Sequence, residues 1–143
     1  SWATSYNGFM HGLPADFLAV VQPAVLACRT NSLFEVESLD GTAFAINQLY
    51  SLKADKFFLL SRPEIFGDWD SASYKDGTQL EYYNGLTATE RIKRDAAGTA
   101  RYVWLRSPHP SHASNARIVY SSGEVRNGGA YYGNGVAPAC IIA

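Results

Sequence analysis

The sequence predicts a single α+β domain over residues 1–143, with helices near the amino end and short antiparallel strands toward the carboxyl end. Apolar residues at helical spacing occur in the first part of the chain, whereas turn signals between short apolar runs dominate after residue 101. Of the 143 residues, 47% are hydrophobic and 17% are charged, which is enough for one core. Long structured loops are expected between these two regions.

The amino-terminal third is expected to contain two short helices. Leu13, Phe17 and Val20 follow helical spacing, and Pro14 suits a first helical turn. Pro23 lacks the backbone N–H group that a helix interior needs, so it would end or kink the first helix. The pattern therefore favours two short pieces over one long helix.

The middle of the chain is expected to hold two strands and a long loop. Residues 34–37 alternate like a half-exposed strand, before a turn signal at 40–41. Residues 57–60 (FFLL) form an apolar run of strand length, which predicts a fully buried strand. Residues 67–98 are polar and carry repeated turn chemistry, so we expect a long, structured excursion over the surface.

The carboxyl-terminal part is expected to be mainly β-structure. Residues 102–105 predict a strand, which the segment 107–110 (SPHP) is expected to stop. Residues 116–127 predict a hairpin around the Ser-Ser-Gly turn at 121–123, and residues 136–142 supply a closing strand.

The alternation of side chains assigns the two faces of this hairpin. It places Val119 and Val125 toward the core. The residues expected to point outward are Ile118, Tyr120, Glu124 and Arg126.

The charge balance limits the partners that the domain can have. Twelve Lys and Arg residues against thirteen Asp and Glu residues give a net charge of −1, which argues against a nucleic-acid partner. The apolar runs are too short to cross a bilayer, so no membrane insertion is expected.

Motifs for catalysis and for metal binding are missing. The sequence has no nucleophile elbow, phosphate-binding loop or dinucleotide fingerprint. His109 and His112 could share a metal, but no cysteine or carboxylate nearby completes the ligand set, so two exposed loop histidines are favoured. Asp68 and Asp70 could act as an acid/base pair, although hydrogen bonds to backbone are the commoner role of such residues in a turn. We therefore expect no enzyme, no cofactor and no metal.

The two cysteines leave a disulfide open. Cys28 and Cys140 could pair, but buried free thiols are favoured in a chain with this much apolar content. Neither cysteine has a CxxC partner, so a structural zinc site is not expected.

The last part of the chain has the composition of an adaptable binding surface. After Ser107 the only charged residues are Arg117, Glu124 and Arg126, whereas tyrosine, histidine, asparagine, serine and glycine are abundant. Ordinary loops can have a similar composition, so both interpretations stay open on these grounds.

Several motifs resemble one known family. The matching residues are 104–108 (WLRSP), Ala116, Arg117, Val119, 121–123 (SSG), Val125, Ala130 and 134–140 (NGVAPAC). In these residues the chain resembles the carboxyl-terminal region of variable proteins of diversity-generating retroelements, in the branch common in phages and prophages of gut bacteria. Upstream, residues 57–61 (FFLLS) and 81–83 (EYY) look like the central segment of that family. The resemblance covers most of the chain.

This resemblance implies a C-type-lectin-like fold, related to that of formylglycine-generating enzymes, with a variable region at about residues 104–143. In such systems an error-prone reverse transcriptase rewrites adenines of a template repeat, and the copy replaces the variable repeat in the gene. Asparagine codons are adenine-rich and are therefore the usual targets. Family members are often longer at the amino end, so a part that carried an attachment or oligomer contact could be missing here.

The genetic code offers a check on this implication. An AAC or AAT codon altered at its first two bases can encode His, Pro, Ser, Ile, Tyr, Arg or Gly, which are the residue types found here, whereas Glu124 needs a different template codon. The expected ligand-binding residues, called the variable surface below, are His109, Pro110, His112, Ser114, Asn115, Ile118, Tyr120, Glu124, Arg126, Asn127, Gly128, Gly129, Tyr131, Tyr132 and Gly133.

The resemblance also sets limits on function. The calcium-binding Glu-Pro-Asn type of triplet is missing, and Cys28 and Cys140 match no catalytic cysteine pair. The expected function is therefore receptor recognition without catalysis. The expected partner is a protein or glycan on a bacterial surface. The domain would be carried on a phage tail, on another displayed structure or on the host cell surface. It could form a homo-oligomer or be attached to a virion. Two alternatives remain: an enzyme with a cleft beside Trp104 and Trp69, and a purely structural virion domain.

Overall fold

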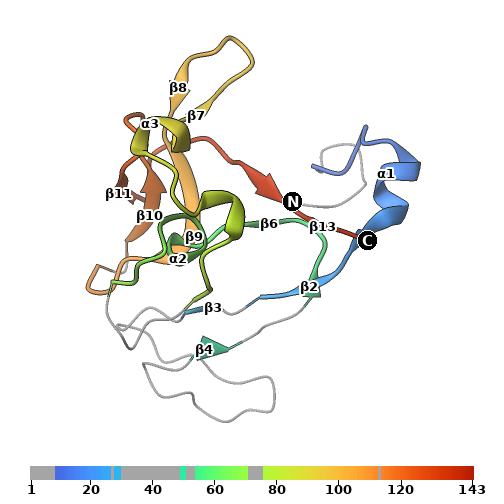
Figure 1. Cartoon of the computed structure of the whole chain (residues 1–143), viewed down its shortest axis with the longest axis horizontal. Coiled ribbons are helices and arrows are strands. Elements are labelled where there is room, and N and C mark those ends of the chain that lie inside the picture. The colour runs from blue at the N-terminus through green and yellow to red at the C-terminus, as the bar shows by residue number, and fades with distance from the viewer. Residues whose placement is uncertain (1–8, 27, 30–48, 51–53, 71–75, 113) are drawn as a thin grey trace.

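A three-stranded antiparallel sheet lies at the centre of the carboxyl-terminal half. The computed structural model describes residues 9–26, 28–29, 49–50, 54–70, 76–112 and 114–143. The sheet has the order β11-β10-β9, formed by β9 (Val103–Pro108), β10 (Asn115–Val119) and β11 (Val125–Gly129) (Figure 1). Its register pairs Val119 with Val125 and also Val119 with Val103.

A tight turn joins β10 to β11 and confirms the predicted hairpin. The Gly123 backbone N–H group donates to the Tyr120 carbonyl at 2.8 Å, and that of Tyr120 donates to the Glu124 carbonyl at 2.8 Å. Gly123 has a φ of +83°, and a Cβ atom there would lie 1.7 Å from the carbonyl oxygen of Ala88. The turn therefore requires glycine, both for its backbone conformation and for its close approach to the neighbouring helix.

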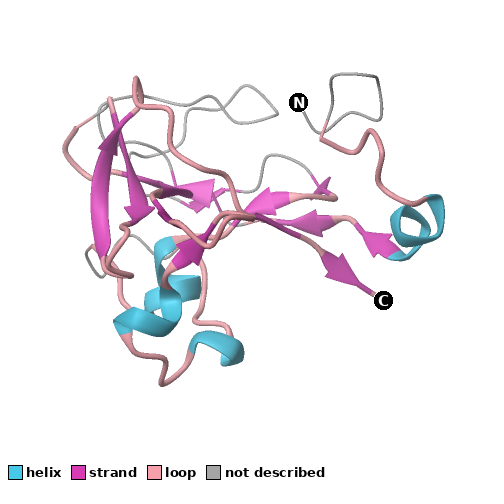
Figure 2. Ribbon diagram, turned by 90° about the horizontal axis from the view of Figure 1, so that it is seen from above, coloured by secondary structure: helices cyan, strands magenta, loops and turns pink. Residues whose placement is uncertain are grey.

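Five short two-stranded ladders occur among the described residues, and two of them tie the first half of the chain to its last residues. Figure 2 shows the carboxyl terminus near the first helix, away from the central sheet. The pairs are β1 (Val21–Gln22) with β13 (Ile141–Ile142), β2 (Ala24–Val25) with β5 (Ala54–Asp55), β3 (Cys28–Arg29) with β4 (Leu49–Tyr50), β6 (Phe58–Leu59) with β12 (Pro138–Ala139), and β7 (Lys93–Arg94) with β8 (Ala100–Arg101), all antiparallel.

The helices are short. They are α1 (Ala15–Val20), α2 (Arg62–Phe66), the 3-10 helix η1 (Glu81–Tyr83) and α3 (Ala88–Arg91). Ser61 and Glu64 form a capping box that starts α2, and Gly67 ends this helix in the left-handed conformation. No helix among the described residues is long and apolar enough to cross a membrane.

The core lies between the central sheet and the short helices that follow β6. Val119, Leu105, Ile65 and Tyr83 form one buried cluster, with Val119 fully inaccessible to solvent. Alternate residues of β9 are buried along its whole length, as expected for a strand with one face on the core. The core therefore holds one face of the sheet in place.

The observed elements confirm the predicted α+β class and the position of the first helix. The second predicted helix is wrong, because residues 21–25 form β1 and β2, which pair with β13 and β5 around Pro23. The closing strand is also divided, since Cys140 separates β12 from β13. The strand predicted at residues 34–37 lies outside the described residues.

Three further predictions need correction. The apolar run 57–60 is only partly buried: Phe57 is buried, but the two-residue strand β6 that follows is half-buried and pairs with β12. The strand predicted at 102–105 is longer than expected, because β9 continues to Pro108, which pairs with Ala116, and ends there inside the segment 107–110. The loop 67–98 contains η1, α3 and β7, none of which the turn chemistry predicted.

Candidate functional site

The residues of the variable surface lie on the last strands of the central sheet and on the loops that join and follow them. Eight are exposed, namely His112, Ser114, Glu124, Arg126, Asn127, Tyr131, Tyr132 and Gly133. Four are half-buried, namely His109, Pro110, Asn115 and Tyr120, and three are buried, namely Ile118, Gly128 and Gly129.

Part of this surface forms one cavity of about 330 Å³, which we call the central hollow. Six of its lining residues belong to the variable surface, and two more, Tyr102 and Asn134, were not predicted. The complete lining is Tyr102, Ile118, Tyr120, Asn127, Gly128, Tyr132, Gly133 and Asn134. Residues from β10, β11 and the loop after β11 therefore meet around one space, together with Tyr102 just before β9.

Tyrosine rings form the walls of the central hollow. Tyr102 and Tyr120 are stacked, with ring centroids 4.5 Å apart and an interplanar angle of 14°. Their hydroxyl groups lie 3.2 Å apart and share one hydrogen bond, which is the main reason that the pKa of Tyr120 is raised above its ordinary value. Arg126 lies over the Tyr120 ring at 5.7 Å and pairs with Glu124 at 3.1 Å. This wall is held together by contacts among its own side chains.

The floor of the central hollow is buried, which corrects the assignment of Ile118 to an outward face. Ile118 is 3% exposed and lies opposite Trp104 in the sheet. A Cβ atom on Gly128 would lie 2.7 Å from Cζ3 of Trp104, so the ring occupies the space that a side chain at this position would need. Both faces of the sheet are therefore covered around these residues. Alternation alone cannot indicate a sheet that is covered on both faces.

A second cavity of about 320 Å³ adjoins the central hollow, and Tyr102, Gly133 and Asn134 line both. Backbone hydrogen bonds of Gly135 hold the loop after β11 against the start of β9. The Gly135 N–H group donates to the Tyr102 carbonyl at 2.7 Å, and the Gly135 carbonyl accepts from the Trp104 N–H group at 3.0 Å. Arg101 lines this second cavity and forms an ion pair with Asp95 at 2.7 Å.

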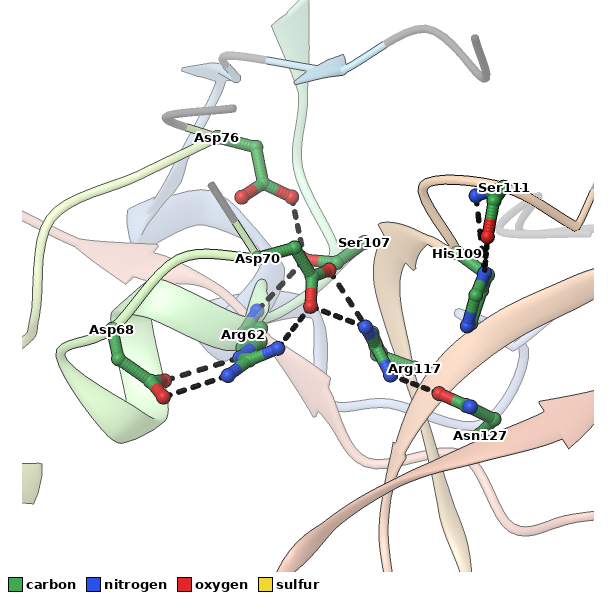
Figure 3. Close-up of polar contacts among 9 residues, drawn as sticks. All are labelled: Arg62, Asp68, Asp70, Asp76, Ser107, His109, Ser111, Arg117 and Asn127. Carbon is green, nitrogen blue, oxygen red and sulfur yellow. Dashed lines mark hydrogen bonds and ion pairs between the residues drawn. The ribbon is translucent and has the colours of Figure 1, made fainter. Parts of the chain in front are cut away.

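Behind the central hollow, a chain of ion pairs reaches Asn127 (Figure 3). The Asp70 carboxylate accepts hydrogen bonds from the guanidinium groups of Arg62 and Arg117, and its side chain is only 4% exposed. Nε of Arg117 donates to Oδ2 of Asp70 at 3.0 Å, and Nη1 donates to the Oδ1 atom of Asn127. Arg62 also binds Asp68, with Nη2 2.7 Å from Oδ2. Asp68 and Asp70 thus serve as anchors for arginine, which is not the arrangement of an acid/base pair.

A second polar group connects α2 to β9. Arg106 pairs with Glu64 through two contacts of 2.5 and 2.6 Å, and it donates to the Asp76 carbonyl at 2.8 Å. Asp76 is 2% exposed and accepts a hydrogen bond from the Ser107 hydroxyl. These buried contacts fix the scaffold on which the hollow is built.

The two histidines that were expected to be exposed loop residues lie side by side on the loop after β9, with His112 exposed and His109 half-buried. The His109 and His112 rings have centroids 4.7 Å apart, and Nδ1 of His109 accepts a hydrogen bond from the Ser111 N–H group at 3.1 Å (Figure 3). Within the part of the chain that the structure describes, no group of three or more His, Cys, Asp or Glu residues is arranged to hold a metal ion. Cys140 is a free thiol and is half-buried.

A family model, described as "Domain of unknown function (DUF6273)", matches residues 7–143. The chain belongs to the DUF6273 family. No curated protein and no solved structure matches this DUF6273 domain. The match covers the central sheet, the central hollow and the ion pairs behind it, so all of these features lie inside the family's domain.

Proposed function

We propose that this domain is a non-enzymatic binding module whose carboxyl-terminal surface recognises a protein or glycan receptor on a bacterial surface. The observation that carries the proposal is the central hollow. This hollow is lined by six of the residues that the resemblance and the genetic code predict to bind the ligand. Predicted binding residues that line one cavity support a shared role in binding.

The separation of core from surface supports the same proposal. Val119 and Leu105 belong to the buried cluster, whereas Tyr131 and Tyr132 are 79% and 58% exposed. Substitutions at such exposed positions leave the core packing intact, so the surface can change while the fold persists. Tyrosines in this position offer large contact areas with few rotatable bonds.

The finer part of the proposal concerns fold family and origin. We infer that the domain is C-type-lectin-like and is a variable protein of a diversity-generating retroelement, displayed on a phage tail, another structure or the host cell. At seven of the eight exposed positions, all except Glu124, the residue type is one that an original or altered asparagine codon encodes, and this is the main support. A purely structural virion role would instead require Tyr131 and Tyr132 to be buried against a neighbouring subunit.

Two matched libraries test the binding proposal. The first applies altered asparagine codons at seven exposed positions of the variable surface: His112, Ser114, Glu124, Arg126, Asn127, Tyr131 and Tyr132. The control applies the same codons at seven exposed positions elsewhere: Gln22, Thr78, Glu81, Tyr82, Thr89, Ala96 and Ala97. Both are displayed on phage and selected against the same panel of purified bacterial surface proteins and glycans.

The proposal predicts specific binders from the first library only, with both libraries displaying folded protein at similar levels. Equal numbers of binders from the two libraries would contradict it. Loss of folded protein in the first library would show that these residues serve the fold, and would also contradict the proposal.

A further inference from the structure

We infer that the central hollow accepts a neutral, proline-containing segment of a protein partner. This inference rests on the proposed binding function and names the partner chemistry that the present side chains select. The lining is uncharged, presents a fixed hydrogen-bond donor and has apolar walls.

The lining of the central hollow carries no formal charge. Its eight residues are three tyrosines, two asparagines, two glycines and one isoleucine. Two arginines that contact lining residues are already paired, because Arg117 binds Asp70 and Arg126 binds Glu124. A charged ligand group would lose water here without gaining an opposite charge, which is costly. The hollow therefore favours a neutral group.

One polar group of the lining, the Asn127 amide, is fixed as a hydrogen-bond donor toward a ligand. A guanidinium group can only donate, so the contact from Arg117 must engage the amide oxygen of Asn127. The amide NH2 group of Asn127 is then left to donate, and the two ion-paired contacts of Arg117 to Asp70 hold this orientation (Figure 3). The hydroxyl groups of Tyr102 and Tyr120 share one hydrogen bond, so one O–H group of this pair also stays available as a donor.

A ligand that suits this site brings an acceptor for the Asn127 amide and an apolar body for the tyrosine walls. A proline residue brings a carbonyl acceptor and has no N–H group. Its ring can pack on aromatic side chains, as in aromatic-lined grooves that bind polyproline II segments. The Tyr120 and Tyr132 rings and the Ile118 floor provide such a surface.

Titration of the isotope-labelled protein, followed by NMR, tests this inference. The probes are a capped hexaproline peptide, a capped peptide of alanine and glycine of equal length, and maltohexaose. We expect hexaproline alone to shift the side-chain resonances of Asn127, Ile118 and Tyr120. No shift with hexaproline, or shifts with maltohexaose alone, would overturn the inference.

Two substitutions locate the binding. Tyr132→Ser removes a wall of the hollow at an exposed position and should weaken hexaproline binding about tenfold. Tyr82→Ser removes a tyrosine of similar exposure on η1, outside the hollow, and should leave the affinity unchanged. Equal weakening by both would contradict the inference. If hexaproline fails while the first library yields binders, the inference falls and the proposed function stands.

Discussion

Asp70→Asn should destabilise the domain by about 3–4 kcal/mol, because it removes the negative charge between two arginines. The Asp70 side chain is 4% exposed, and those of Arg62 and Arg117 are 15% and 13% exposed. Breaking one partner of a buried ion pair usually costs about 3–5 kcal/mol, since the other charge stays buried without compensation. We place the effect in the lower part of that range because Arg62 keeps its pair with Asp68.

Urea unfolding, monitored by circular dichroism, measures the loss of unfolding free energy. Asp68→Asn is the matched control, because Asp68 binds the same Arg62 but is 55% exposed, so the expected loss is about 0–1 kcal/mol. Equal losses in the two variants would refute the reasoning, because burial would then have no influence on the strength of the pairs.

The remaining predictions concern the core, the exposed tyrosines and pH. Val119→Ala should cost about 2–3 kcal/mol in urea unfolding, since Val119 is fully buried in the central cluster. The double variant Tyr131→Ser/Tyr132→Ser should change thermal stability by less than about 1 kcal/mol, and a collapse of the fold would place these tyrosines in the core. The hydrogen bond from the Thr87 backbone lowers the pKa of Glu90 below its ordinary value of 4.5, so its stabilising effect is present above that value and is lost as the pH falls through the lower folded pKa. The difference in stability between the original chain and Glu90→Gln should therefore shrink at acidic pH, and a difference that is constant with pH would contradict this.

Local patterns predicted the hairpin well, because its signals are local. The Ser-Ser-Gly turn, the alternation before it and the apolar residues after it lie within a few residues of each other, and the structure forms β10 and β11 there. The outward direction of Ile118 was wrong, since that rule assumes that one face of the sheet is in water. Trp104 and the tyrosines around the central hollow cover that face instead.

The contacts behind the hollow could not be predicted from local patterns. Asp70 and Arg117 are separated by 47 residues, and no periodicity relates a loop carboxylate to an arginine on a distant strand. Tyr102 was predicted only as part of a strand, and its place in the hollow depends on stacking against Tyr120 across the sheet. The β7–β8 hairpin, by contrast, carries a local signal that was overlooked, because Asp95 and Gly98 form its tight turn.

Sequencing the DNA on both sides of the gene tests the central claim most directly. The proposal predicts a nearby reverse transcriptase gene and a near-copy of the segment that encodes residues 104–143, with mismatches confined to adenines of the near-copy. These mismatches should fall in codons of the variable surface that no longer encode asparagine, Tyr120 and Tyr132 among them, and should spare the codons of Leu105 and Val119 in the core. A near-copy that differs at other bases, or one whose mismatches fall in the core codons, would contradict the claim that this surface is diversified for binding.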